Sequence, residues 1–184
     1  GPTYEVLDPV RYIGNASSGK MGIALAEELH FRGANVILIM GPTHEKITHS
    51  FQVIQVTSAE EMYDACIENF EQVDWAIMSA AVADYTPVKK EIQKIKKSED
   101  GLVVELKKTK DILYTLGHLK KADQYIIGFA LETNNEKENA LGKLHSKNAD
   151  LIVLNSLNDP GAGFGHNSNK ITIFDKRGGE YHFD

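Results

Sequence analysis

The apolar residues alternate along the chain between two spacings, and this alternation constrains the fold more than any other feature. Short runs rich in β-branched residues, such as residues 35–40, are typical of buried strands. Between them lie segments such as residues 18–32, in which apolar residues recur every three or four positions, as they do in helices. Strands and helices that alternate in this way predict an α/β fold with a mostly parallel sheet.

The same patterns predict where the elements begin. Two capping boxes, at residues 58–61 and 133–136, and a capping Thr109 mark the starts of helices. A ribbon follows the third strand, with a turn at residues 98–101 and one arm at residues 102–107. We expect strands at 35–40, 51–56, 73–79, 125–130 and 150–154, helices at 18–32, 58–70, 109–121 and 133–147, a loop at 155–169, and a hairpin at 170–175 and 180–183.

These elements predict one Rossmann-like, doubly wound domain over residues 1–184, with the ribbon inserted into it. In such a fold a first strand would precede Gly1 and a helix would follow the last hairpin, so we expect both ends to be trimmed. Ligands of open α/β sheets bind beyond the carboxyl ends of the strands. The loops that follow the strands are therefore where we expect the functional residues.

Composition excludes several classes of protein. Lysine and arginine number 20 against 26 acidic residues, a net charge of −6, which argues against a general nucleic-acid binder. The single cysteine, Cys66, allows no internal disulfide, indicates a reducing compartment, and lies on a helix face with Met62 and Phe70, as a core residue would. The apolar runs are too short for a membrane span. We expect a cytoplasmic protein.

The glycine-rich segment at residues 14–20 (GNASSGK) has the spacing of a phosphate-binding loop. That motif requires serine or threonine at the next position to hold magnesium, and this chain has Met21. Small residues before a helix still allow backbone N–H groups to meet an anion. The alternative, at even odds, is that Ser17 or Ser18 only caps the helix. The dinucleotide fingerprint G-x-G-x-x-G is absent, which argues against an NAD enzyme.

Further candidates follow other strands. Asp84 comes after a strand and a run of small residues that would allow a planar ring to approach, although a turn or capping role is the simpler alternative. Lys143 and Lys147, four positions apart, share a helix face and form either a phosphate clamp or a solvated surface. Phe129 is more often a core residue than a stacking platform. A cluster of lysines lies in the predicted ribbon, where a period of two would put Lys94 and Lys96 on one face: Lys89, Lys90, Lys94, Lys96 and Lys97.

Several segments, in order, resemble the phosphopantothenate–cysteine ligases, which in many bacteria form the C-terminal half of a bifunctional coenzyme A biosynthesis protein. The resemblance covers nearly the whole chain and is specific. The segments that carry it are residues 1–3 (GPT), 8–13 (DPVRYI), Asn15, 17–22 (SSGKMG), 80–84 (AAVAD), 94–97 (KIKK), 111–113 (DIL), 128–129 (GF), 132–133 (ET) and 147–148 (KN).

The resemblance implies an activity in which the carboxylate of 4′-phosphopantothenate is joined to the amine of L-cysteine. Bacterial members use CTP, with Mg²⁺, through an acyl-cytidylate, and eukaryotic relatives tend to use ATP. The resemblance places the family's catalytic asparagine and lysine on Asn15 and Lys94. It places substrate and phosphate contacts on Arg11, Asn15, Ser17, Ser18, Gly19 and Ala81, and nucleotide contacts on Asp84, Lys94, Lys110, Asp111, Ile112, Leu113, Phe129, Lys143 and Lys147.

The chain departs from the family at two positions, because Lys110 replaces a common proline and Ala16 a bulkier residue. The resemblance also implies a homodimer formed through the ribbon, no flavin in these residues, and a decarboxylase fused upstream in some parent proteins. The ligand of the metal stays unknown, since the seven histidines have no paired spacing. Two alternatives remain: a phosphate-loop kinase or NTPase, and a catalytically silent nucleotide-binding module.

Overall fold

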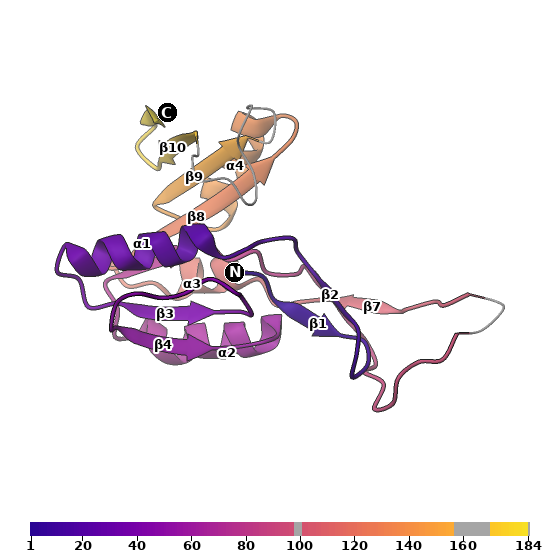
Figure 1. Cartoon of the computed structure of the whole chain (residues 1–184). Coiled ribbons are helices and arrows are strands. Elements are labelled where there is room, and N and C mark those ends of the chain that lie inside the picture. The colour runs from indigo at the N-terminus through magenta and orange to yellow at the C-terminus, as the bar shows by residue number, and fades with distance from the viewer. Residues whose placement is uncertain (98–100, 157–169, 184) are drawn as a thin grey trace. The chain divides into compact units, whose positions relative to one another are not determined.

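The computed structural model describes residues 1–97, 101–156 and 170–183 (Figure 1). The chain divides into two compact units, one of residues 1–66 and 80–110 and the other of residues 67–79 and 111–184. The division falls within helix α2 (Ala59–Phe70). Each unit has its own strands and buried side chains.

The first unit combines two antiparallel strand pairs with one parallel pair. The parallel pair, β3 and β4, lies between helices α1 and α2 in Figure 1. β1 pairs with β2, and β6 pairs with β7 at the base of the long loop that projects from the unit. The elements are β1 (Tyr4–Val6), β2 (Tyr12–Gly14), α1 (Lys20–Phe31), β3 (Ile37–Met40), β4 (Gln52–Gln55), β6 (Tyr85–Pro87) and β7 (Leu106–Lys108).

Helix α2 begins where the capping box predicts. The Ser58 hydroxyl accepts a hydrogen bond from the Glu61 N–H at 3.2 Å, and the Glu61 carboxylate accepts one from the Thr57 N–H at 2.7 Å. The Glu5 side chain, from β1, accepts a hydrogen bond from the Ala59 N–H at 2.8 Å. Glu5 is only 2% exposed, so this hydrogen bond satisfies a buried carboxylate oxygen. The helix start is therefore tied to the β1–β2 hairpin through a buried carboxylate.

The second unit is built on a five-stranded sheet in the order β11-β10-β9-β8-β5. β5, β8 and β9 run parallel, and β10 and β11 continue the sheet as an antiparallel hairpin. Helix α4 packs on β8, β9 and β10 through buried Ala140 and Leu144. The elements are β5 (Trp75–Met78), α3 (Ile112–Leu119), β8 (Tyr125–Glu132), α4 (Glu136–Ser146), β9 (Leu151–Ser156), β10 (Ile171–Asp175) and β11 (Glu180–Phe183).

A buried carboxylate joins several elements of this unit. Asp150, which is 4% exposed, accepts hydrogen bonds from Lys120 Nζ and from the Ile126 N–H, both at 2.8 Å, and from Lys176 Nζ. Burial alone would raise the pKa of Asp150, but the two lysines and the N–H outweigh it and lower the pKa. The carboxylate is held ionised where α3, β8, β9 and the β10–β11 turn meet.

The α/β class and the parallel central strands are confirmed, and four local predictions are wrong. Helix α3 is capped by Asp111 instead of Thr109, and the N-cap of α4 is Asn135, with φ of 45°, instead of Thr133. Asn155 lies in β9 instead of a loop. Residues 91–97 form no strand, so no two-residue period orders their lysines.

Other predictions fall on residues that the structure does not describe. They are residues 98–100 of the turn predicted at 98–101 and residues 157–169 of the loop predicted at 155–169. The single-domain organisation stays a prediction.

Candidate functional site

The loop after β2 ends in a left-handed glycine at the start of α1. Gly19 is the N-cap, with φ of 86°, and no side chain caps the helix. Helix α1 therefore begins two residues later than predicted, and neither Ser17 nor Ser18 is its N-cap. Ser18 Oγ accepts the Lys20 N–H at 3.3 Å. The first-turn N–H groups that follow have no intrahelical acceptor, which is the feature that attracts anions to helix N-termini.

Neighbouring residues fix the course of this loop. Thr43 Oγ1 donates a hydrogen bond to the Ser18 carbonyl at 2.5 Å and accepts one from the Glu45 N–H at 3.1 Å. A Cβ added to Gly19 would lie 3.2 Å from Gly1 Cα, in a backbone conformation that side chains disfavour. The loop differs from a true phosphate-binding loop because it follows β2, a strand of an antiparallel hairpin.

Asn15 lies against the segment that follows β5. Its Nδ2 donates hydrogen bonds to the carbonyls of Ala81, at 2.9 Å, and Val82, at 3.2 Å. Because both partners are carbonyl oxygens, the amide nitrogen must face them, and Oδ1 is left to accept a hydrogen bond from a ligand. The structure thus brings together two predicted site residues, Asn15 and Ala81.

Two threonines that the sequence analysis did not assign to the site hold this segment in place. Thr3, which is fully buried, accepts the Ala83 N–H at 3.0 Å through Oγ1. Thr109 donates its hydroxyl to the Ala83 carbonyl at 2.7 Å and its N–H to the Asp84 carbonyl at 2.9 Å. The Asp84 side chain is exposed at the end of this braced segment. Thr109 had the pattern of a helix cap, which concealed this role.

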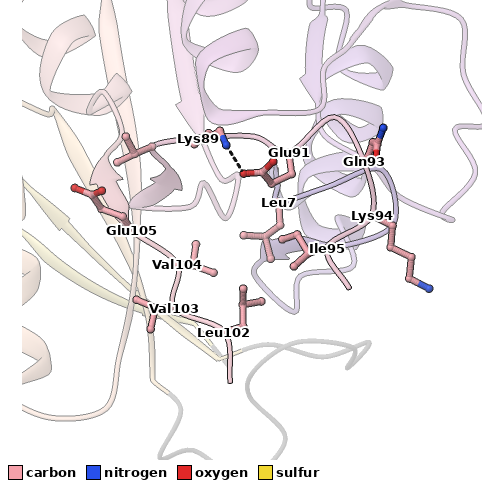
Figure 2. A pocket seen from close by; sticks show the side chains of 11 residues that line it. Leu7, Lys89, Glu91, Gln93, Lys94, Ile95, Leu102, Val103, Val104 and Glu105 are labelled. Carbon is pink, nitrogen blue, oxygen red and sulfur yellow. Dashed lines mark ion pairs between the residues drawn. The ribbon is translucent and has the colours of Figure 1, made fainter. Parts of the chain in front are cut away.

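The lysine-rich segment lines a cavity of about 450 Å³ within the first unit (Figure 2). Its apolar wall includes Leu7, Ile95 and Leu102. In Figure 2 the Lys94 side chain points away from this wall, and Nζ has no hydrogen-bond or ion-pair partner among the described residues. By contrast, Lys89 pairs with Glu91 at 2.7 Å. Lys94 is thus an exposed cation on a segment whose neighbouring residue, Ile95, is half-buried against the cavity.

Arg11 and Lys110 are both engaged by carboxylates of their own unit. Arg11 pairs with the buried Asp8. Lys110 Nζ lies 4.5 Å from the centroid of the Tyr63 ring and 3.9 Å from carboxylate oxygens of Glu60 and Asp64, on the surface of α2. These contacts place Lys110 beside α2, and no contact joins it to Asn15 or Lys94 among the residues described.

The second unit brings together a compact group of predicted nucleotide contacts. Asp111 caps α3 by accepting the Tyr114 N–H at 2.8 Å, and its other oxygen accepts Lys147 Nζ at 2.6 Å. Lys143 Nζ donates to the Phe129 carbonyl at 2.9 Å. Burial acts to raise the pKa of Asp111, but the hydrogen bonds from Lys147 and Tyr114 and the charge of Lys143 outweigh it, so the pKa is lowered.

The next two predicted residues, Ile112 and Leu113, pack into the unit. Ile112, in the first turn of α3, is 4% exposed, so its side chain belongs to the core of the unit. Leu113 lies over Gly128 of β8, where an added Cβ would come within 2.8 Å of Leu113 Cδ2. The absence of a side chain at Gly128 therefore lets the start of α3 approach the sheet.

Among residues 1–97, 101–156 and 170–183, no three His, Cys, Asp or Glu side chains are grouped so as to hold a metal ion. Over the same residues, no helix has the length and apolar character needed to cross a bilayer.

Comparison with known proteins gives consistent matches. The family described as the DNA/pantothenate metabolism flavoprotein C-terminal domain matches residues 1–184. A cysteine/cysteine sulfinic acid decarboxylase from an unknown prokaryotic organism is 52% identical over 177 residues, 96% of this chain and 49% of that protein. The coenzyme A biosynthesis bifunctional protein CoaBC of Bacillus subtilis (strain 168) is 46% identical over 179 residues, 97% of this chain and 44% of that protein.

A solved structure matches as well. The crystal structure of the C-terminal domain of a coenzyme A biosynthesis bifunctional protein CoaBC aligns with a TM-score of 0.83 and 42% identity, covering all of this chain and 82% of that one. The chain spans about half the length of the curated relatives it matches.

Proposed function

The chain belongs to the DNA/pantothenate metabolism flavoprotein C-terminal domain family, and from that premise we propose that it joins 4′-phosphopantothenate to L-cysteine at the expense of CTP. The match of this family over residues 1–184, shared with proteins named CoaBC, is the observation that carries the proposal. The grouping of Asn15 with the 81–82 carbonyls, and of two lysines with Asp111, supports it. The fold alone would not, because one fold serves many functions.

In the first proposed step, a carboxylate oxygen of phosphopantothenate attacks the α-phosphorus of CTP, and pyrophosphate leaves. The products are an acyl-cytidylate and pyrophosphate. The carboxylate and the triphosphate are both anionic, so positive charge must offset their repulsion. Lys94 is the candidate because the resemblance places the family's lysine there, and its ammonium is exposed and unpartnered among the described residues.

We propose that magnesium enters the site bound to the nucleotide. Mg²⁺ commonly binds through substrate phosphates together with only one or two protein carboxylates. Asp84 is the exposed carboxylate of the braced segment that would face such an ion. When bound, Mg²⁺ would neutralise phosphate charge.

In the second proposed step, the cysteine amine attacks the acyl carbon, and CMP leaves with the carboxylate-derived oxygen. Negative charge develops on the acyl oxygen, and Asn15 is proposed to donate an amide N–H to it. This requires one of its two carbonyl bonds to be exchanged, and the Val82 bond is the longer, at 3.2 Å against 2.9 Å. One donor of this kind is typically worth about 3 kcal/mol, or a hundredfold in rate.

Lys143 and Lys147 are proposed to bind the nucleotide in the second unit. Each ammonium is already held by an acceptor, Phe129 O or Asp111, so its position is set before a ligand arrives. A phosphate would compete with Asp111 for Lys147, and the lowered pKa of Asp111 keeps this carboxylate charged at neutral pH. The pair would therefore exchange partners without a change in protonation.

We also propose a homodimer that buries the projecting ribbon. Its apolar side chains are exposed, with Ile92 at 91% and Val103 at 95%, more than an isolated ribbon would favour. Sedimentation should give a dimer at micromolar concentration, and a monomer would contradict this part of the proposal. A decarboxylase fused upstream in the parent protein and a cytoplasmic location complete the proposal.

The test supplies 4′-phosphopantothenate and Mg²⁺ with CTP or ATP, with and without cysteine, and follows products by mass spectrometry. Wild type should release pyrophosphate and form the acyl-nucleotide without cysteine, and the amide with it. Lys94→Gln should slow pyrophosphate release in the first step without abolishing it, whereas Asn15→Asp should accumulate the acyl-cytidylate. Nucleotide hydrolysis that ignores the acid would refute the proposal and favour an NTPase.

A further inference from the structure

Asp8 is a completely buried carboxylate in the turn between β1 and β2. Its side chain is 0% exposed. Oδ1 accepts the N–H groups of Val10, at 2.8 Å, and Arg11, at 2.9 Å. Oδ2 accepts Arg11 Nε at 3.0 Å and a second bond from Arg11 Nη2. The guanidinium, aided by backbone N–H groups, holds the pKa of Asp8 well below its ordinary value despite burial.

Two further hydrogen bonds lead from this turn to the lysine-rich segment. The Ile95 N–H donates to Asp8 Oδ2 at 3.0 Å, and Arg11 Nη2 donates to the Ile95 carbonyl at 2.7 Å. Both backbone polar groups of Ile95 are therefore satisfied by side chains. The Asp8–Arg11 pair supplies the acceptor and the donor that the backbone of a neighbouring strand would supply in a sheet.

This connection matters because, among the residues that the structure describes, the segment has few other hydrogen bonds. Residues 91–97 form no strand, and the other hydrogen bond from this stretch to the turn joins the Glu91 N–H to the Leu7 carbonyl at 2.9 Å. Leu7 and Ile95 also line the same cavity (Figure 2). The N–H that Asp8 binds belongs to the peptide bond between Lys94 and Ile95, so the carboxylate fixes the backbone that carries Lys94.

We propose that Asp8 is a positioning residue for Lys94, and that Arg11 acts with it by clamping Ile95. The inference rests on the proposed role of Lys94 in the first chemical step. Arg11 Nε and Nη2 are committed to this clamp, which gives Arg11 a role other than contact with the substrate. A displacement of about 1 Å in a reacting geometry can cost about 100-fold in rate.

The kinetic test is a double-mutant cycle of Asp8→Asn with Lys94→Gln, measured as pyrophosphate release from phosphopantothenate and Mg·CTP. Asparagine replaces one carboxylate oxygen with an NH₂ group, which cannot accept the hydrogen bonds that Arg11 and the Ile95 N–H donate to Asp8. We expect Asp8→Asn to slow the step by about 10- to 100-fold, with the KM for CTP changed less than about threefold. In the Lys94→Gln background it should slow the step by less than about twofold. An equal slowing in both backgrounds would overturn the inference.

Amide hydrogen exchange tests the clamp without any reaction. Asp8→Asn should speed exchange across residues 88–97. Glu5→Gln is the matched control, since Glu5 is a buried carboxylate of the same hairpin whose bond goes to Ala59 N–H. It should leave that segment unchanged. Unchanged exchange in Asp8→Asn would overturn the clamp.

A second variant covers the case in which Asp8→Asn does not fold. Arg11→Lys keeps the charge beside Asp8 but removes the forked bonds, and it should also speed exchange at Ile95. Unchanged exchange in this variant would likewise overturn the clamp. If wild type releases no pyrophosphate, the proposed function fails, while exchange still decides whether the clamp exists.

Discussion

Gly117, in the last turn of α3, lies where the backbone of Lys147 approaches the helix. A Cβ at this position would lie 1.8 Å from the Lys147 carbonyl oxygen, whereas ordinary contact begins at 3.4 Å. The oxygen belongs to the backbone and cannot rotate away, so α3 and the end of α4 would have to separate by about 1.6 Å. The same approach is fixed by the Asn148 side chain, which donates to the Gly117 carbonyl at 2.6 Å.

The size of the effect follows from two opposing contributions. Overpacking typically costs about 1–3 kcal/mol and more where backbone must move, while alanine gains up to about 1 kcal/mol over glycine within a helix. We therefore expect Gly117→Ala to lower the free energy of unfolding by about 2 kcal/mol, or about 4–8 °C in Tm. Because Lys147 moves with its carbonyl, CTP affinity measured by calorimetry should fall as well.

The matched control is Gly142→Ala in α4. A Cβ there has nothing within 4 Å, so only the gain in helix propensity remains. Thermal unfolding should show this variant equal to wild type or up to about 1 kcal/mol more stable. If Gly117→Ala is as stable as Gly142→Ala and binds CTP normally, the close approach of α3 to Lys147 is wrong.

Two further substitutions and one labelling experiment test other parts of the structure. Asp150→Asn should lower the free energy of unfolding by about 3 kcal/mol at pH 7, because buried Lys120 loses its counter-charge. Since the pKa of Asp150 is lowered in the folded state, its carboxylate stabilises the fold at neutral pH and loses this effect in acid. Urea titrations should therefore show the difference from wild type shrinking as the pH falls below about 4. Asp111→Asn keeps a residue that can cap α3 but removes the ion pair with Lys147. Thermal unfolding should show a loss of less than about 1 kcal/mol in the free energy of unfolding. A larger loss would mean that the ion pair stabilises the fold. Burial raises the pKa of Cys66 to about 11, so iodoacetamide at pH 8 should label it about 10–100-fold more slowly than free cysteine, and labelling as fast as in denaturant would contradict its burial.

Much of the fold and the family could be predicted from local sequence. The capping box at Ser58 and Glu61 acts over three residues, and the structure confirms it. The resemblance to the ligase half of CoaBC proteins is confirmed by the family match, since motifs such as SSGKMG and AAVAD lie in order along the chain. The capping box at 133–136 is equally short and failed, because α4 begins after Asn135 in a left-handed conformation.

The errors arose where a distant partner decides the role of a residue. Thr109 has the pattern of a cap, but its hydroxyl donates to Ala83, 26 positions away. The lysine-rich segment was expected to be a strand, yet Asp8, 87 positions before Ile95, supplies the acceptor that a strand would have provided. Asn15 was assigned a catalytic role through the resemblance, and the structure adds that its N–H groups meet carbonyls 66 and 67 positions away. Periodicity and spacing contain no information on such contacts.

In the proposed reaction, the acid is activated through its own carboxylate oxygen at the α-phosphorus of the nucleotide. The most direct measurement uses 4′-phosphopantothenate labelled with ¹⁸O in the carboxylate, together with Mg·CTP and cysteine. Mass spectrometry should find one ¹⁸O in the phosphate of CMP and none in inorganic phosphate. Label in inorganic phosphate, or unlabelled CMP beside the amide product, would contradict the account.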